Sequence, residues 1–228
     1  MKLCVYFGTF NPIHNAHLAV ANFVRTNYDF DVILFVPAYK PPHKDIDDEL
    51  AHHRLNMVKL AISGESLFSF SNIEYSNVRY SYTYLTIQEL YKRYTGIEGK
   101  INFIIGSDAF KEFETWYQAE ELKKLIKFIV FPRQKEFSLH QFDYLKERGY
   151  DFEIAPLQFI DLSSRVIRSR IKKGKSVQGL LPPAVIDYIN KNGLYRPKPE
   201  EDEGTILLNT VKINNEKDDE DNNNKPKT

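Results

Sequence analysis

Two histidines three residues apart stand in the segment Gly8–Leu18, directly after an apolar run that predicts a buried strand. Because the residues that follow have helical periodicity, His14 and His17 should share one face at the start of a helix. A helix start offers backbone N–H groups and the positive end of the helix dipole, and together these favour a site for polyphosphate. Single histidines are often caps or core residues, and a metal pair would need further ligands that no Cys or His cluster in the sequence supplies.

Four later segments carry polar or aromatic residues that could complete such a site. They are Pro37–Lys44, Ser81–Thr83, Ile104–Asp108 with Trp116 and Tyr117 downstream, and Asp161–Arg168. Gly106, at a strand end, would let a ligand approach the backbone, and Asp108 could accept hydrogen bonds from a ribose or cap the next helix. Ser163 or Ser164 can cap a helix whose first N–H groups would bind phosphate, and Arg168 lies one turn later with a guanidinium fork suited to phosphate oxygens.

Each of these later segments also has a simpler structural interpretation. Lys44 lies in a proline-stiffened loop that could be merely solvated. Thr83 looks like a helix N-cap, and Trp116, the single tryptophan of the chain, has core packing as its default role although an indole can also stack on an aromatic ring. Two phosphate-suited helix starts in one chain favour the functional interpretation.

Apolar strand-like runs alternate with helical patterns along the chain. The expected strands are Lys2–Phe7, Val32–Pro37, Leu67–Ser71, Ile101–Ile105, Ile126–Phe131 and Phe152–Ala155. The expected helices are Asn15–Asn27, Asp48–Ser63, Thr83–Tyr94, Gln118–Leu125, Ser138–Arg148, Ser163–Lys173 and Pro182–Asn192. This alternation predicts an α/β fold, a parallel sheet with helices on both faces. Because ligands bind beyond the carboxyl ends of such strands, the loops after the first, second and fourth strands should meet at one edge.

The composition predicts one compact domain, residues 1–195, and an acidic, asparagine-rich tail, residues 196–228, without stable structure. The totals of 31 basic and 31 acidic residues include four lysines and nine acidic residues from position 200 onward. The body therefore holds 27 basic and 22 acidic residues, an excess that suits a small anionic substrate and falls short of the basic stripe of a nucleic-acid binder.

Cys4, in the first strand, has no cysteine with which to form an internal disulfide. Neither a signal peptide nor a membrane-length apolar run is present, so we expect a cytoplasmic protein without a membrane partner.

In their order and spacing these segments resemble the nucleotidyltransferases that carry HxGH and ISSTxIR-type signatures, and within them the bacterial nicotinate-nucleotide adenylyltransferases. The resemblance runs from Lys2 to Tyr195. It rests on Gly-Thr-Phe-x-Pro-Ile-His-x-x-His-Leu at 8–18, Pro-Pro-His-Lys at 41–44, Ser-Tyr-Thr at 81–83, Ile-Ile-Gly-Ser-Asp at 104–108 with Trp116, Leu-Ser-Ser-x-x-Ile-Arg at 162–168 and the closing stretch 181–195. It implies a Rossmann-like nucleotidyltransferase fold and a reaction of ATP with nicotinate mononucleotide that yields deamido-NAD and pyrophosphate. It also implies Mg2+ held mainly by substrate phosphates, and a homo-oligomer is one option for the assembly.

The resemblance implies roles for the residues that match the family motifs. On the ATP side they are Gly8, Thr9, Phe10, His14, His17, Gly106, Asp108, Ser163, Ser164 and Arg168. On the nicotinate mononucleotide side they are Lys44, Thr83, Trp116 and Tyr117, with the indole on the nicotinate ring and backbone near Thr83 and Tyr117 facing its carboxylate. The implied catalytic set is His14, His17, Lys44 and Arg168. These residues would position and neutralise charge while a mononucleotide phosphate oxygen attacks the ATP α-phosphorus, a nucleophile that needs no strong base.

Four positions depart from the family pattern, and two other functions stay open. Asn11 replaces Asp, Ala16 replaces Gly, Arg165 replaces Thr and Leu85 replaces Asp. None of these removes a residue that the implied reaction needs. A sister transferase would use nicotinamide mononucleotide or another phosphorylated acceptor. A catalytically weak nucleotide-binding protein would also fit the departures and the acidic tail.

Overall fold

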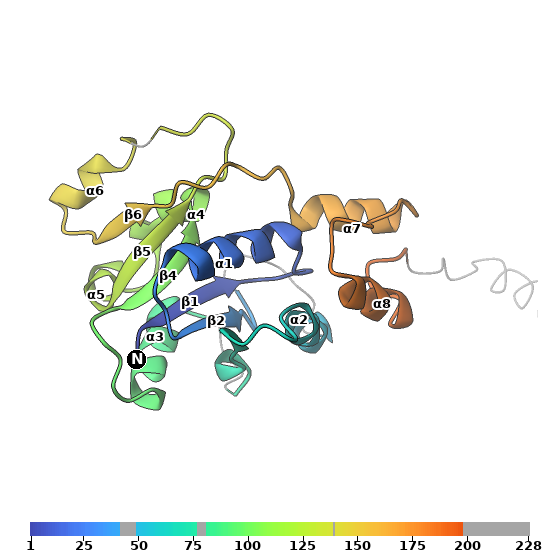
Figure 1. The fold of residues 1–228 in the computed structure, drawn as a ribbon, viewed down its shortest axis with the longest axis horizontal. Helices are drawn as coiled ribbons and strands as arrows, with labels where there is room; N and C mark the ends of the chain where they lie inside the picture. The colour runs from blue at the N-terminus through green and yellow to red at the C-terminus, as the bar shows by residue number, and fades with distance from the viewer. Residues whose placement is uncertain (42–48, 77–80, 139, 198–228) are drawn as a thin grey trace, which may run out of the picture. The chain divides into compact units, whose positions relative to one another are not determined.

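The computed structural model describes residues 1–41, 49–76, 81–138 and 140–197, and Figure 1 shows their arrangement. The strands are β1 (Leu3–Gly8), β2 (Val32–Pro37), β3 (Phe68–Phe70), β4 (Ile101–Gly106), β5 (Ile126–Phe131) and β6 (Phe152–Ile154). The α-helices are α1 (Asn15–Asn27), α2 (Glu49–Ala61), α3 (Thr83–Arg93), α4 (Ser107–Lys111), α5 (Ala119–Leu125), α6 (Asp143–Glu147), α7 (Ser164–Lys172) and α8 (Pro183–Lys191). Two 3-10 turns, η1 (Ile73–Tyr75) and η2 (Phe113–Thr115), complete the described elements.

The six strands form one parallel sheet in the order β3-β2-β1-β4-β5-β6. This is the strand order of a doubly wound Rossmann sheet, and the direction of winding reverses between β1 and β4. The Rossmann-like parallel sheet expected from the sequence is therefore confirmed.

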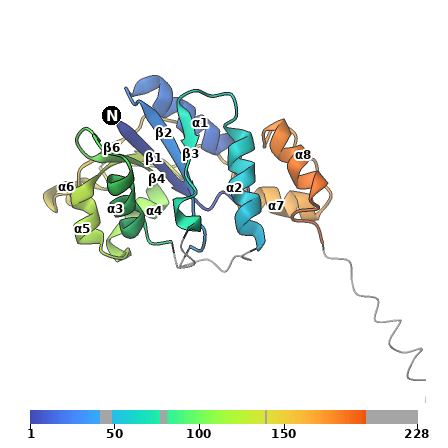
Figure 2. The same cartoon turned by 90° about the horizontal axis from the view of Figure 1, so that it is seen from below.

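Different helices cover the two faces of the sheet, as Figures 1 and 2 show. Alternate strand residues point to opposite faces. Cys4 and Ile33 therefore pack in one core with residues of α1, α2, α7 and α8, and Val5 and Leu34 pack in a second core with residues of α3, α4, α5 and α6. Strands buried on both faces need apolar residues at nearly every position, which is why β1 and β2 appear as continuous apolar runs in the sequence and β5 as a run interrupted by Lys127.

Most expected elements agree with the structure to within two residues, and the region before β6 does not. The helix expected over Ser138–Arg148 is wrong, because only α6 (Asp143–Glu147) is an α-helix. Ahead of it the amides of Gln141 and Asp143 donate to carbonyls three residues back, which are bonds of tight turns. Leu139 lies outside the described residues.

Two features near the site also differ from expectation. Thr83 is the first residue of α3 and Tyr82 is its N-cap, so the expectation that Thr83 caps the helix is wrong. The short helix α4, directly after β4, was not expected, because five residues are too few to show helical periodicity.

The compact unit of the chain runs from Met1 to Tyr195. Most of the expected tail, residues 198–228, lies outside the described residues, so its character stays a prediction. Within the described ranges, no helix is both long and apolar enough to cross a membrane.

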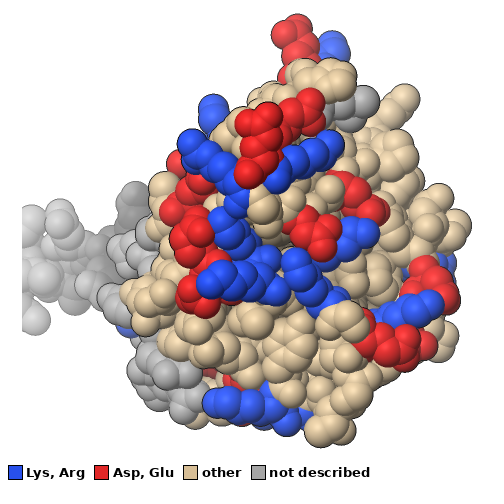
Figure 3. All heavy atoms as spheres, turned by 90° about the vertical axis from the view of Figure 1, so that its left-hand side faces the viewer, with Lys and Arg blue, Asp and Glu red and all other residues tan. Residues whose placement is uncertain are grey.

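Charged side chains on the face that carries α5 and α6 are arranged in pairs. Lys124 contacts Glu121 at 2.8 Å and Arg148 contacts Glu114 at 2.7 Å. Figure 3 shows this face, with basic and acidic side chains next to one another. Much of its positive charge is thus matched locally by carboxylates, and exposed pairs of this kind contribute only about 0.2–1 kcal/mol each.

Candidate active site

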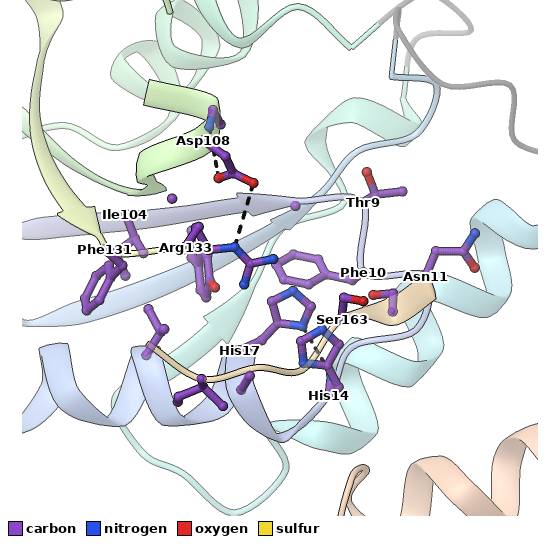
Figure 4. Close-up of a pocket in the computed structure, with 18 of the residues that line it drawn as sticks. Thr9, Phe10, Asn11, His14, His17, Ile104, Asp108, Phe131, Arg133 and Ser163 are labelled. Carbon is purple, nitrogen blue, oxygen red and sulfur yellow. Dashed lines mark hydrogen bonds and ion pairs between the residues drawn. The ribbon is translucent and has the colours of Figure 1, made fainter. Parts of the chain in front are cut away.

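A pocket of about 1060 Å³ lies at the carboxyl ends of β1 and β4 (Figure 4). The two strands are paired from Cys4 to Tyr6 on β1, opposite Asn102 to Ile104 on β4. Both strands continue for two further residues, to Gly8 and Gly106, and these glycines line the pocket. The pocket therefore opens where the strands separate, at the switch point at which Rossmann sheets bind ligands.

The structure brings together all the residues expected on the ATP side. The pocket lining includes Gly8, Thr9, Phe10, His14, His17, Gly106, Asp108, Ser163, Ser164 and Arg168. Of the four residues expected on the mononucleotide side, Lys44 lies outside the described residues. Thr83, Trp116 and Tyr117 are described, and they are not part of this lining.

The two histidines are stacked at the start of α1, with ring centroids 3.6 Å apart. The His14 backbone N–H donates to His17 Nδ1 at 3.2 Å, so the neutral His17 ring carries its proton on Nε2. His14 is 1% exposed, and among the described residues no group hydrogen-bonds its Nδ1. Burial, together with the nearby Arg133 charge, lowers the His14 pKa to about 4, so this ring is neutral at pH 7.

The start of α1 offers fewer free backbone donors than the sequence suggests. The N–H of Asn15, the first helical residue, donates to Leu180 O at 2.9 Å, and the Asn15 side chain donates to Gly179 O at 2.8 Å. These bonds fix the helix start to the segment before α8. The N–H of the first helical residue is thus already bonded, and the partly exposed His17 ring lines the pocket at this helix start.

The loop before the histidines owes its shape to Gly8 and Phe10. Phe10 has φ +47° and is 2% exposed, an uncommon backbone conformation for a bulky residue. Its ring packs over Gly8, where an added Cβ would lie 2.6 Å from Phe10 Cζ. Edge contacts with Tyr6 and His17, at centroid distances of 5.6 and 5.1 Å, hold the ring next to His17.

The start of α7 is bonded directly to the same loop. Ser163 is the N-cap, and its side chain accepts from the Val166 N–H, as expected. Ser164 Oγ donates to Pro12 O at 2.9 Å, and the Arg168 guanidinium donates to Asn11 O at 2.7 Å. In this structure Arg168 therefore supports the loop as well as lining the pocket.

Asn11 has a structural partner that sequence spacing did not reveal. Tyr195 Oη donates to Asn11 Oδ1 at 2.6 Å, and Tyr195 itself lines the pocket. A neutral amide oxygen can accept this bond, although a carboxylate would be the stronger acceptor, so the departure from Asp is compatible with the contact. Of the other departures, Ala16 and Arg165 both line the pocket, and Arg165 is exposed there.

Arg133 is a pocket residue that the sequence analysis missed. Its Nε lies 3.8 Å from Asp108 Oδ2, and Figure 4 shows the side chain extending from Asp108 toward Phe10. Asp108 and Arg133 both cover Gly106, where an added Cβ would lie 2.6 Å from Asp108 Oδ1 and 2.7 Å from Arg133 Cγ. Gly106 thus makes room for this ion pair. A basic residue two positions after β5 was the available signal, at the same sheet edge as the other candidates.

The aromatic residues expected on the mononucleotide side form a separate group. The Trp116 ring packs 5.2 Å from that of Phe113 and is partly buried. Tyr117 is 48% exposed, and its ring lies 4.9 Å from that of Tyr82, the residue before Thr83. Thr83 and Tyr117 therefore border one surface. Trp116 packs against the core, which is the simpler of the two roles that the sequence allowed for it.

The described residues offer few metal ligands near the pocket. Among them, no three His, Cys, Asp or Glu side chains are grouped so that they could hold an ion. Asp108 is the carboxylate in the pocket lining, and it is paired with Arg133. Such a donor set suits Mg2+ that is bound through substrate phosphates and water.

Comparisons with known proteins agree with this geometry. The chain matches the model of the cytidylyltransferase-like family over residues 5–170. Proteins named "Probable nicotinate-nucleotide adenylyltransferase" from Caldicellulosiruptor saccharolyticus and Carboxydothermus hydrogenoformans are 37% and 38% identical to it, over 86% of this chain and 100% and 98% of their own lengths. A solved structure of nicotinic acid mononucleotide adenylyltransferase from Plasmodium falciparum, complexed with NaAD, has a TM-score of 0.71 at 22% identity, covering 85% of this chain and 96% of that one.

The sheet order and the pocket at its switch point, taken with the family match, define a nucleotidyltransferase. The identity and coverage of the named relatives also define the family within this class. The chain belongs to the nicotinate-nucleotide adenylyltransferase family. The expected fold and enzyme class are both confirmed.

Proposed function

We propose that this chain transfers the adenylyl group of ATP to nicotinate mononucleotide, giving deamido-NAD and pyrophosphate, and that the pocket between β1 and β4 binds the ATP. The observation that carries the proposal is the convergence of two helix starts and two histidines on one pocket at the switch point. The names of the relatives supply the acceptor, nicotinate mononucleotide.

The residues around the pocket have the chemistry that a triphosphate requires. His14 and His17 both line the pocket, and His17 is partly exposed there, so a ligand oxygen can approach its ring. Arg133, Arg165 and Arg168 bring three guanidinium groups to the lining. Because burial keeps His14 neutral in the substrate-free chain, we assign it a hydrogen bond to phosphate and leave the charge neutralisation to the arginines.

In the proposed reaction, a phosphate oxygen of the mononucleotide forms a bond to the α-phosphorus of ATP. The bond from that phosphorus to the oxygen bridging to the β-phosphate breaks, and pyrophosphate leaves with the electron pair. The phosphate nucleophile is already anionic near pH 7, so the protein needs to align the two phosphates and stabilise the negative charge. We assign this task to His14, His17, Lys44 and Arg168. The two histidines would donate hydrogen bonds, and Lys44 would add its charge to that of Arg168.

We assign the mononucleotide to the surface bordered by Thr83 and Tyr117. The contact between the rings of Tyr82 and Tyr117 brings these two segments together. Trp116 would need to present one face of its ring to the nicotinate while keeping its contact with Phe113. Mg2+ would supply further charge neutralisation while bound mainly to phosphate oxygens.

The test measures how much deamido-NAD forms from ATP and nicotinate mononucleotide. The amount is compared with the product that forms from nicotinamide mononucleotide under the same conditions. We expect much less product with the amide. Replacement of His17 by Ala should lower the rate by roughly 10²–10³-fold, the usual effect of losing one preorganised contact to the transition state. His140→Ala is the matched control, because His140 is exposed and bonded to Asp143.

Full activity of His17→Ala would refute the assignment of the phosphate site, and equal rates with both mononucleotides would refute the acid preference. We also infer a cytoplasmic location and a homo-oligomer as one option for assembly. Cell fractionation and the mass of the particle in solution test these two inferences.

A further inference from the structure

One buried arginine contacts the backbone of the loop after β1 and is not itself part of the pocket lining. Arg54, on α2, is 0% exposed and carries a formal charge at neutral pH. A buried charge is costly unless hydrogen bonds compensate for its lost hydration. The partners of Arg54 therefore indicate what this charge stabilises.

The Arg54 guanidinium donates to backbone carbonyls of two different loops. It contacts Thr9 O at 2.8 Å, in the loop after β1. It also contacts Ala38 O at 2.5 Å and Tyr39 O at 2.8 Å, directly after β2. The loop after β1 lines the pocket that the proposed function assigns to ATP. The loop after β2 precedes Lys44 in the sequence, a residue to which the proposed function gives a role in the transfer.

The loop after β2 is bonded in turn to the start of α3. The Tyr39 N–H donates to Glu74 Oε2 at 3.3 Å, and Thr86 Oγ1 donates to Glu74 Oε1 at 2.8 Å. The Lys40 N–H donates to Ser81 Oγ at 3.1 Å. Arg54 thus belongs to a network that joins the ATP loop after β1, through the loop after β2, to the start of α3, which borders the surface assigned to the mononucleotide.

We propose that Arg54 is a positioning residue, which fixes the loop after β1 relative to the loop after β2 and so aligns the two substrates for transfer. The proposal rests on the proposed function for the identity of those substrates. Arg54 does not line the pocket, so it acts through the backbone of Thr9, Ala38 and Tyr39.

A guanidinium suits this task because it is planar and presents several donors in a fixed fork. In Arg54→Lys a single ammonium keeps the charge and cannot reproduce that fork toward carbonyls on two loops. Arg54→Met keeps a long side chain and removes the charge. Each variant should loosen the relative position of the loops, and a misplacement of about 1 Å can cost roughly 100-fold in rate.

The test measures steady-state kinetics and amide hydrogen exchange on the full chain. For Arg54→Lys we expect kcat/KM for deamido-NAD formation to fall by at least tenfold. We also expect at least tenfold faster exchange at Ala38, Tyr39 and Lys40, whose N–H groups bond to Gly8 O, Glu74 and Ser81. Exchange at Ala155, whose N–H bonds to Val130 O at the far side of the sheet, should stay within twofold of the unchanged protein.

Arg25→Lys is the matched control, because Arg25 is a partly exposed residue of α1 whose guanidinium pairs with Glu65. It should change neither kcat/KM nor the exchange at residues 38–40. If Arg54→Met does not fold, Arg54→Lys carries the test. A smaller fall in kcat/KM for Arg54→Lys, or exchange that rises equally at Ala155, would overturn the positioning role.

The exchange measurement separates this proposal from the proposed function. If the unchanged protein makes no deamido-NAD, the proposed function fails. Selective faster exchange at residues 38–40 in Arg54→Lys would still support the role of Arg54 in fixing the loops, and unchanged or uniform exchange would overturn it.

Discussion

His14 should make the stability of this protein depend on pH in a way that can be calculated from its burial. Its ring is 1% exposed, and desolvation, followed by the charge of Arg133, lowers its pKa from 6.5 to about 4. In the unfolded chain the same ring is solvated and binds a proton near pH 6.5. Between these two pH values the unfolded state binds more protons at this position than the folded state.

The sign and size of the effect follow from this difference in bound protons. Stability rises with pH wherever the unfolded state binds more protons, so the contribution of His14 is fully present above pH 6.5. It is lost as the pH falls from 6.5 toward 4, at about 1.36 kcal/mol per pH unit. Lowering the pH from 7 to 5 should therefore cost about 2 kcal/mol through His14 alone.

The assay compares the unchanged protein with His14→Gln, which removes the titrating group and keeps a hydrogen-bonding side chain. Urea unfolding at pH 7 and at pH 5 gives the free energy of unfolding of each protein, and the other titrating groups cancel in the comparison. The unchanged protein should lose about 2 kcal/mol more than the variant. Equal losses would refute the argument that burial keeps His14 neutral.

Three further substitutions test the local structure around the pocket. Gly8→Ala should destabilise the fold by roughly 1–3 kcal/mol, because the new Cβ would lie 2.6 Å from the Phe10 ring, and unchanged thermal unfolding would contradict this packing. Tyr195→Phe should cost about 1–3 kcal/mol in urea unfolding, since it removes the donor to Asn11 Oδ1, and a neutral effect would mean that another donor replaces it. Ser163→Ala should cost only about 0.5 kcal/mol, the lower end for an N-cap, because its bond to Val166 is 3.4 Å long, and a loss above 2 kcal/mol would point to a further role.

Elements with strong local signals were predictable from the sequence. α1, β2 and β5 have the bounds that periodicity and apolar runs indicated, and the strand–turn–helix signal around Gly8–Leu18 located the pocket. The carboxyl-end rule for parallel sheets then brought the ATP-side candidates together before any geometry was known. Local pattern and one topological rule were enough for this part of the site.

Long-range contacts of single residues were not predictable in the same way. Arg54 looks like any basic residue in a helical pattern, and only the fold shows that its guanidinium lies beneath two loops. Arg133 follows β5 by two positions, which indicates the right sheet edge and not its contact with Asp108. Tyr195 follows α8, and nothing in its spacing indicates the pocket. Thr83 shows the opposite error, because a residue of a good capping type lies one position inside the helix.

The bond between Tyr195 and Asn11 joins residues 184 positions apart. The first loop of the pocket therefore emerges early during synthesis, and its partners on α7 and at Tyr195 emerge last. A nascent chain can form β1 and α1 while Asn11 still lacks the Tyr195 hydroxyl that its side chain meets in the finished protein. Any product of premature termination before Tyr195 would carry the histidine motif without this closing contact. Translation to the end of the compact unit is thus a condition for assembling the complete pocket.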